Sequence, residues 1–212
     1  MYFFAKNLYF LIFWLIFEVF IFLSLKHPKI MLTEFQTLKI QKLFNFFDAD
    51  GNKVIEPEDM DMIAEQFIKI FGWKIGDDND KKFRGALKKY WRKLLLGADT
   101  DQDQSVSFEE FKKAYERHLS SKENYEEFVL PFIDQVFPVI DTNQDGVLQP
   151  AEFAHLYEGF RNPKDEASKV FAKLDSNGDG SLSKEEIYQH FYDFHFSEDR
   201  NIAGNAFFGE LS

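Results

Sequence analysis

The chain has 212 residues, a formal net charge of −11 and no cysteine. The lack of cysteine excludes thiolate catalysis, disulfide bonds and zinc sites built on thiolates. The acidic balance argues against nucleic acid as a partner and against unaided attraction to anionic lipid.

Residues 8–25 form an apolar run that only Glu18 and Ser24 interrupt. As a helix this run would be about 27 Å long, close to the thickness of the hydrocarbon core of a bilayer. Three interpretations remain open for residues 1–30. The first is a signal anchor that keeps the protein on a membrane. The second is a cleaved signal peptide. The third is that translation begins at Met31 and the protein is cytoplasmic. Binding to a membrane is expected only if residues 8–25 are retained.

The first acidic loop, residues 48–59, lies between two predicted helices. Thr33 is expected to cap the entering helix, with Gln36 as the partner in a capping box. Leu38 and Met62 belong to the apolar faces predicted for the entering and exiting helices, and Gly72 ends the exiting helix. Oxygen donors recur at alternate positions of the loop, which predicts these cation ligands: Asp48, Asp50, Asn52, the backbone carbonyl of Val54, and Asp59.

The second acidic loop, residues 99–110, follows a helix predicted over residues 80–96. Gln104 stands at its sixth position, where the chain must adopt a positive φ at a cost of about 1 kcal/mol for a residue with a Cβ. Lys53 stands at the same position of the first loop. The ligands predicted for the second loop are Asp99, Asp101, Asp103, the backbone carbonyl of Ser105, and Glu110.

Two further loops repeat the spacing, at residues 141–152 and 175–186, and both have glycine at the sixth position. The helix predicted before the third loop contains Pro131 and Pro138, so we expect a kink or an early break there. The ligands predicted in these loops are Asp141, Asn143, Asp145, the backbone carbonyl of Val147, and Glu152, followed by Asp175, Asn177, Asp179, the backbone carbonyl of Ser181, and Glu186.

The spacing of all four loops is that of the EF-hand, in which a twelve-residue loop surrounds Ca²⁺ with oxygen atoms. A single hand leaves one apolar side open, so we predict an all-α fold of four EF-hands in two paired lobes. Short β-bridges should join Ile55 to Val106 and Leu148 to Leu182. The predicted divisions are an apolar N-terminal helix within residues 1–30, a first pair in 31–120, a second pair in 121–196, and a tail in 197–212.

Residues 33–212 resemble the calerythrin and sarcoplasmic calcium-binding protein family. The resemblance rests on the first loop, with Asp59 where most EF-hands have glutamate, on the uneven spacing of the loops, and on the ending Tyr192-Asp193-Phe194-His195-Phe196. It implies one compact globule with packed lobes, and a soluble calcium buffer or sensor. The second loop departs from the family, where it is often degenerate, and the apolar N-terminus is not part of the family.

The predicted function is therefore binding of up to four Ca²⁺ ions by a monomeric buffer or signal modulator. The shorter Asp59 predicts Mg²⁺ competition at the first site. The first alternative is a sensor that opens a groove for a helix of a target protein. An outlying alternative is a carrier of an apolar small molecule. No enzyme motif is present, and we predict no catalytic activity. Phe207 and Phe208 make the tail too apolar to remain in solvent, and whether it covers a groove of the same chain stays open at this point.

Overall fold

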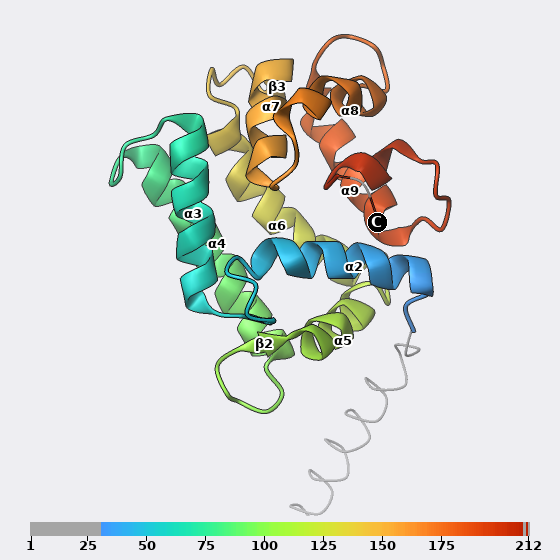
Figure 1. The fold of residues 1–212 in the computed structure, drawn as a ribbon. Coiled ribbons are helices and arrows are strands. Elements are labelled where there is room, and N and C mark those ends of the chain that lie inside the picture. Colours follow the sequence, from blue (N-terminus) through green and yellow to red (C-terminus); the bar gives the residue numbers. More distant parts are fainter. Residues whose placement is uncertain (1–30, 210, 212) are drawn as a thin grey trace, which may run out of the picture.

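The computed structural model describes residues 31–209 and 211, and the fold of this part is mainly helical (Figure 1). Each of four short strands lies within an acidic loop and precedes the helix that leaves this loop. The elements in chain order are α2 (Glu34–Phe47), β1 (Val54–Ile55), α3 (Pro57–Phe71), α4 (Asp78–Ala98), β2 (Val106–Ser107), α5 (Phe108–His118), α6 (Lys122–Ile140), β3 (Val147–Leu148), α7 (Pro150–Gly159), the 3-10 helix η1 (Lys164–Glu166), α8 (Ala167–Leu174), β4 (Leu182–Ser183), α9 (Lys184–Phe196), and the 3-10 helix η2 (Ala203–Ala206).

The ends of the first helices follow from local chemistry. The hydroxyl of Thr33 accepts a hydrogen bond from the backbone of Gln36, and the side chain of Gln36 accepts one from the backbone of Thr33, both at 3.1 Å. This is the predicted capping box. Gly72 follows α3 with a φ of 68°, the left-handed conformation that commonly ends a helix.

The strands join the four loops into two pairs. β1 pairs with β2 in antiparallel register, with Ile55 opposite Val106. β3 pairs with β4 in the same way, with Leu148 opposite Leu182. All four residues at these bridges are buried, so each bridge also contributes to the core below it. The predicted all-α fold and both predicted bridges are confirmed.

The two pairs are packed into one compact globule with a continuous hydrophobic core. α4 packs against α6, α3 against α7, and α2 against α9, so helices of the first pair contact helices of the second. Gly159 in α7 allows a close approach between α7 and α3. A Cβ at this position would lie 2.3 Å from Cζ of Phe67 in α3, so only glycine fits without movement of the ring.

Of the kink or early break expected in α6, the early break is wrong, because the helix is continuous through Pro131 and Pro138. A proline cannot donate to the carbonyl four residues before it, which for Pro131 is the carbonyl of Glu127. The side chain of Lys93 in α4 donates a hydrogen bond to that carbonyl instead. A contact with a distant helix therefore replaces the hydrogen bond that the proline removes.

Two residues expected on apolar faces are partly exposed. Leu38 is 42% exposed, whereas its neighbour Lys39 is completely buried. Met62 is 44% exposed. The prediction was therefore wrong at these two positions, whereas residues such as Phe35 and Leu43 are buried on α2 as the apolar periodicity predicts.

The apolar run at residues 8–25 and the helix predicted there lie outside the described residues. Among residues 31–209 and 211, no helix combines the length and the hydropathy needed to cross a bilayer.

Candidate calcium sites

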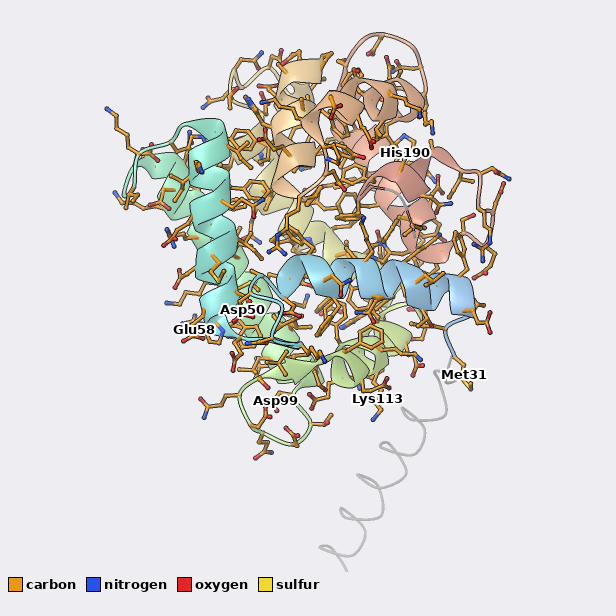
Figure 2. All side chains as sticks on the ribbon, in the orientation of Figure 1. Met31, Asp50, Glu58, Asp99, Lys113 and His190 are labelled. Atoms are coloured by element: carbon orange, nitrogen blue, oxygen red, sulfur yellow. The ribbon has the colours of Figure 1, made fainter. Side chains whose placement is uncertain are left out.

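Each acidic loop begins at the C-cap residue of its entering helix, directly after the last helical residue. Asp48, Asp99, Asp141 and Asp175 are the C-cap residues of α2, α4, α6 and α8. The first ligand position is therefore fixed to a rigid element. Figure 2 shows Asp50 and Asp99, from the first and second loops, at the same end of the molecule, as the β1–β2 pairing requires.

The last ligand position of each loop is also the partner in a capping box of the exiting helix. In all four loops the carboxylate at position 12 accepts one hydrogen bond from the backbone N–H of position 2 and another from that of position 9. The distances to these two donors are 2.7 and 2.7 Å for Asp59, 2.8 and 3.0 Å for Glu110, 2.8 and 3.1 Å for Glu152, and 3.1 and 3.0 Å for Glu186.

A second contact repeats in all four loops. The backbone N–H at position 6 donates to the carboxylate at position 1, so the loop folds back over its own first ligand. The donors and acceptors are Lys53 and Asp48 at 3.1 Å, Gln104 and Asp99 at 3.1 Å, Gly146 and Asp141 at 2.8 Å, and Gly180 and Asp175 at 2.9 Å.

The fold of each loop needs positive φ at two positions, and only the sixth was predicted from the sequence. Lys53 and Gln104 have φ values of 77° and 71°, as predicted for the sixth position. Position 4 is also left-handed in every loop, including Gln102 at 63° and Gln144 at 59°. Each of the first three loops therefore contains at least one non-glycine residue in a conformation that costs about 1 kcal/mol.

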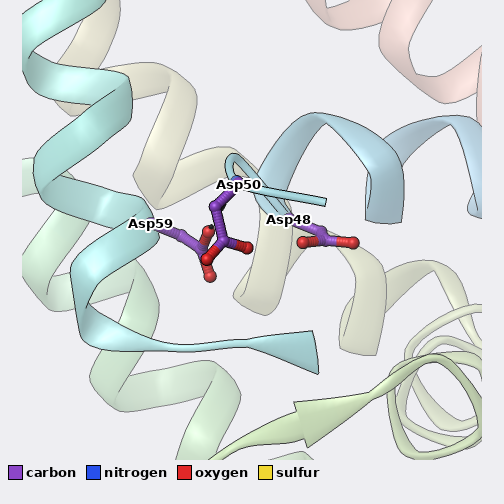
Figure 3. A group of neighbouring side chains, drawn as sticks. All are labelled: Asp48, Asp50 and Asp59. Atoms are coloured by element: carbon purple, nitrogen blue, oxygen red, sulfur yellow. Dashed lines mark hydrogen bonds between the residues drawn. The ribbon is translucent and has the colours of Figure 1, made fainter. Parts of the chain in front are cut away.

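The carboxylates of the first loop converge despite the short side chain at position 12. Oxygens of Asp48, Asp50 and Asp59 lie within 4.8 Å of one another, although they come from the end of α2, the loop and the start of α3 (Figure 3). Asp48 and Asp59 are buried, with exposed fractions of 7% and 2%. Three carboxylates brought this close repel one another unless a cation lies between them.

The second loop forms a similar group. Oxygens of Asp99, Asp101 and Asp103 lie within 4.8 Å of one another. Oδ1 of Asp99 is buried and has no hydrogen-bond partner among the described residues, and the same is true of Oδ1 of Asp48 in the first loop. A buried acceptor without a donor is costly, and a bound cation would satisfy both atoms. The donor sets of these two loops thus fit a hard divalent cation.

The third and fourth loops use asparagine at position 3. The side-chain oxygens of Asn143 and Asn177 accept the backbone N–H groups of Asp145 and Asp179, at 3.1 and 2.8 Å. Asp141 and Glu152 are buried, whereas Asp175 and Glu186 are half-buried. The remaining predicted donors lie where the spacing requires, since Val54 and Val147 begin β1 and β3, and Ser105 and Ser181 directly precede β2 and β4.

The position-12 carboxyl groups of the first two loops differ in electrostatics. Burial opposes ionisation of Glu110, but hydrogen bonds from Thr100 and Ser107 outweigh it and lower its pKa to about 2. Burial raises the pKa of Asp59, against the hydrogen bonds that it accepts. The loops therefore offer carboxylates of different affinity for protons, and the first site holds the less readily ionised one.

Supporting residues were not identified from the sequence. The hydroxyls of Thr100 and Thr142, at position 2, donate to Glu110 and Glu152 at 2.9 and 2.8 Å. In the fourth loop, Nε2 of His190 lies 2.6 Å from the carbonyl of Leu174, one residue before the first ligand. The contacts of Thr100 and Thr142 could have been found from the sequence, because both are hydroxyl residues at position 2 of their loops.

Comparison with known proteins agrees with this geometry. The family model described as an EF-hand domain pair matches residues 37–116 and 132–198. The chain belongs to the EF-hand family. Calerythrin of Saccharopolyspora erythraea is 27% identical over 168 residues, which cover 78% of this chain and 95% of calerythrin.

Two solved structures are similar to this EF-hand chain. A calcium-binding protein of Streptomyces coelicolor is 31% identical, with a TM-score of 0.64, over 74% of this chain and 95% of that one. A sarcoplasmic calcium-binding protein from amphioxus is 22% identical, with a TM-score of 0.69, over 86% of this chain and 100% of that one. The resemblance found from the sequence is confirmed, and the chain is a calcium-binding EF-hand protein.

Proposed function

We propose that this protein is a monomeric calcium buffer that takes up as many as four ions while its apolar core stays closed. The observation that carries this proposal is the position of the tail. Phe207 and Phe208 are 1% and 4% exposed. Their rings pack against Phe160 of the third hand and Phe191 of the fourth, with centroids 4.5 to 6.1 Å apart. The tail thus covers the apolar side of the second pair.

The first pair is covered by the second pair rather than by a tail. Phe67 of α3 stacks on Phe83 of α4, with centroids 4.6 Å apart, and it also fills the space above Gly159 of α7. Opening the first pair would separate these surfaces and expose the aromatic rings to water. Each side chain of that size contributes about 1.5–3 kcal/mol when fully buried, so closed lobes are favoured over a groove for a target helix.

The closed core also weighs against a carrier of apolar molecules. A cavity lined by apolar side chains from both pairs and from the tail, among them Phe46, Phe137 and Phe207, has a volume of about 50 Å³. For comparison, an apolar cavity that binds benzene has a volume of about 150 Å³. A larger aromatic ligand would therefore require the core to expand.

Removal of the tail tests the closed state. Deletion of residues 197–212 should uncover Phe160 and Phe191 and produce strong binding of a hydrophobic dye, with or without calcium. The control is Leu38→Ala, which shortens an exposed side chain. Unchanged dye binding after the deletion would contradict the role assigned to the tail.

The proposal also covers the ligands, the functional units, the competing ion, the partners and the location of the protein. The four ligand sets are those predicted from the loops, the two functional units are residues 31–120 and 121–196, and Mg²⁺ competes at the first site. Calcium ions are the only partners required, and a chain that begins at Met31 would act in the cytoplasm. Support comes from the convergent carboxylates of the first two loops and from their unpaired buried oxygens. Measuring mass in solution with and without Ca²⁺ checks the monomer.

A further inference from the structure

One helix of this acidic protein is strongly basic. α4 contains seven basic residues and two acidic ones, and both acidic residues lie in its first turn. The helix runs along an outer edge of the molecule beside α3 (Figure 1). From Lys81 to the end of α4 no acidic residue occurs. The negative net charge of the whole chain therefore conceals a local basic surface.

Five of these cations share one exposed face, which we call the basic stripe. Lys81, Lys88 and Arg92 are separated by seven and four residues and so lie along one line of the helix. Lys82 and Lys89 lie about 100° around the axis from this line. The opposite face carries buried residues such as Leu87 and Leu94. The basic stripe extends about 17 Å from Lys81 to Arg92, at 1.5 Å per residue.

The stripe has no counterions within residues 31–209 and 211. The two other basic residues of α4 are engaged: Arg84 pairs with Asp61 and Asp80, and Lys93 donates to the carbonyl of Glu127. None of the five residues of the basic stripe forms an ion pair in this part of the chain. All five residues are exposed.

Two exposed apolar side chains flank the stripe. Leu96 near the end of α4 is 89% exposed, and Ile75, three residues before α4 begins, is 82% exposed. By helical geometry Leu96 lies between the two lines of cations, on the same face of α4. Cations close to exposed apolar side chains suit the interface of an anionic bilayer, because the cations attract the lipid headgroups and the apolar side chains can enter the interfacial region.

We propose that the basic stripe is a docking surface for a membrane that contains anionic lipid. Charge complementarity supports this partner, because unpaired cations close to an anionic bilayer each add to the attraction. The shape of the surface supports it too. A convex helix face about 17 Å long fits a broad flat surface, whereas an acidic peptide would need a groove to hold it.

Nucleic acid is the other polyanion to consider. Phosphates would attract the five cations equally well. The exposed Leu96 and Ile75 would gain nothing from phosphates, however, whereas the interfacial region of a bilayer accepts apolar side chains. Flat lipid contact is therefore the better fit.

The test uses the absence of cysteine in the chain. A Leu96→Cys variant of the full chain is labelled with a polarity-sensitive fluorophore, and its emission is followed on vesicles of phosphatidylcholine with and without 30% phosphatidylserine. Calcium is present throughout, because filled loops carry less negative charge. The readout is local to the stripe, so any contribution of residues 1–30 to vesicle binding does not obscure it. A label on Ser168→Cys, which is exposed on α8, reports on a face away from α4.

We expect a blue shift at Leu96→Cys on anionic vesicles only, and none at Ser168→Cys. Adding Lys88→Glu, Lys89→Glu and Arg92→Glu should weaken the response at least tenfold. The matched control Lys69→Glu, Lys113→Glu and Lys169→Glu changes the net charge equally at exposed sites elsewhere, and it should retain most of the response. The proposal is overturned if the Leu96 label does not respond, if both triple variants lose the response equally, or if duplex RNA produces the shift and anionic vesicles do not.

Discussion

Nζ of Lys39 in α2 donates a hydrogen bond of 2.8 Å to the backbone carbonyl of Ser197, the residue that follows α9. The lysine is completely buried, and its ammonium group lies 4.4 Å from the centroid of the Phe35 ring. Burial lowers its pKa to about 8, although two nearby carboxylates act in the opposite direction. The entering helix of the first hand is thus bound to the exit of the fourth through a buried cation.

This contact predicts a pH dependence of stability. The unfolded chain keeps the proton on Lys39 up to the ordinary pKa of 10.5, whereas the folded chain releases it near 8. Between these values the unfolded state binds more protons, so the free energy of unfolding should rise with pH through this window. Lys39→Met should remove that rise, whereas Lys69→Met, at an exposed position of α3, should keep it. Urea unfolding at fixed free calcium, from pH 7.5 to 9.5, measures the slope. Equal slopes for both variants would contradict the assignment.

The contact between Gly159 and Phe67 predicts a large effect of a small substitution. Gly159→Ala places a Cβ 2.3 Å from Cζ of Phe67, so α3 and α7 must separate or the ring must move. Overpacking of this kind typically costs about 1–3 kcal/mol. Gly85→Ala is the matched control, because no atom lies within 4 Å of a Cβ there. It should stabilise α4 by about 0.5–1 kcal/mol. Denaturant unfolding of both variants checks the difference in sign.

The turn of the third loop predicts a cost of backbone strain without any steric contact. Gly146 has a φ of 89°, and no atom lies within 4 Å of an added Cβ. Gly146→Ala should therefore weaken calcium binding at this loop by about 1 kcal/mol, or roughly fivefold. Gly97→Ala has equal space and no positive φ, so binding should not change. Calorimetric titration measures both. Normal binding by Gly146→Ala would show that the loop tolerates another turn.

The short carboxylate of the first loop predicts its ion selectivity. The Asp59 carboxylate accepts the same two backbone hydrogen bonds as the glutamates of the other loops. Coordination of the ion by only one of its oxygens would nevertheless give the smaller coordination shell that Mg²⁺ accepts. Asp59→Glu should reduce Mg²⁺ competition at this loop, and Glu110→Asp should introduce competition at the second. Calcium titration with and without millimolar Mg²⁺ measures the change. Mg²⁺ competition that is unaffected by Asp59→Glu would remove the basis for a mixed site.

The sequence predicted features that depend on spacing along the chain. The loops, the bridge between Ile55 and Val106, and the positive φ of Lys53 and Gln104 all follow from one twelve-residue pattern. Contacts between distant segments could not be predicted in this way. The hydrogen bond from Lys93 that replaces the one lost at Pro131 joins residues 34 positions apart along the chain.

The face of α2 gives a second example. Apolar periodicity favoured Leu38 as buried, but α9 and Ser197 provide an acceptor and aromatic rings that bury Lys39. The net charge could not predict the basic stripe either, because a sum over 212 residues does not show that five cations lie on one face of α4. The basic stripe became apparent only when the buried and exposed faces of α4 were known.

Calcium titration followed at the same time by calorimetry and by a hydrophobic dye tests the central claim most directly. With Mg²⁺ present, a closed buffer should bind as many as four calcium ions while dye fluorescence stays at the level of the ion-free protein. The tail at Phe207 and the contact between Phe67 and Gly159 are the physical reasons for that result. A dye signal that rises in step with calcium uptake would contradict the account and identify a sensor with an opening groove.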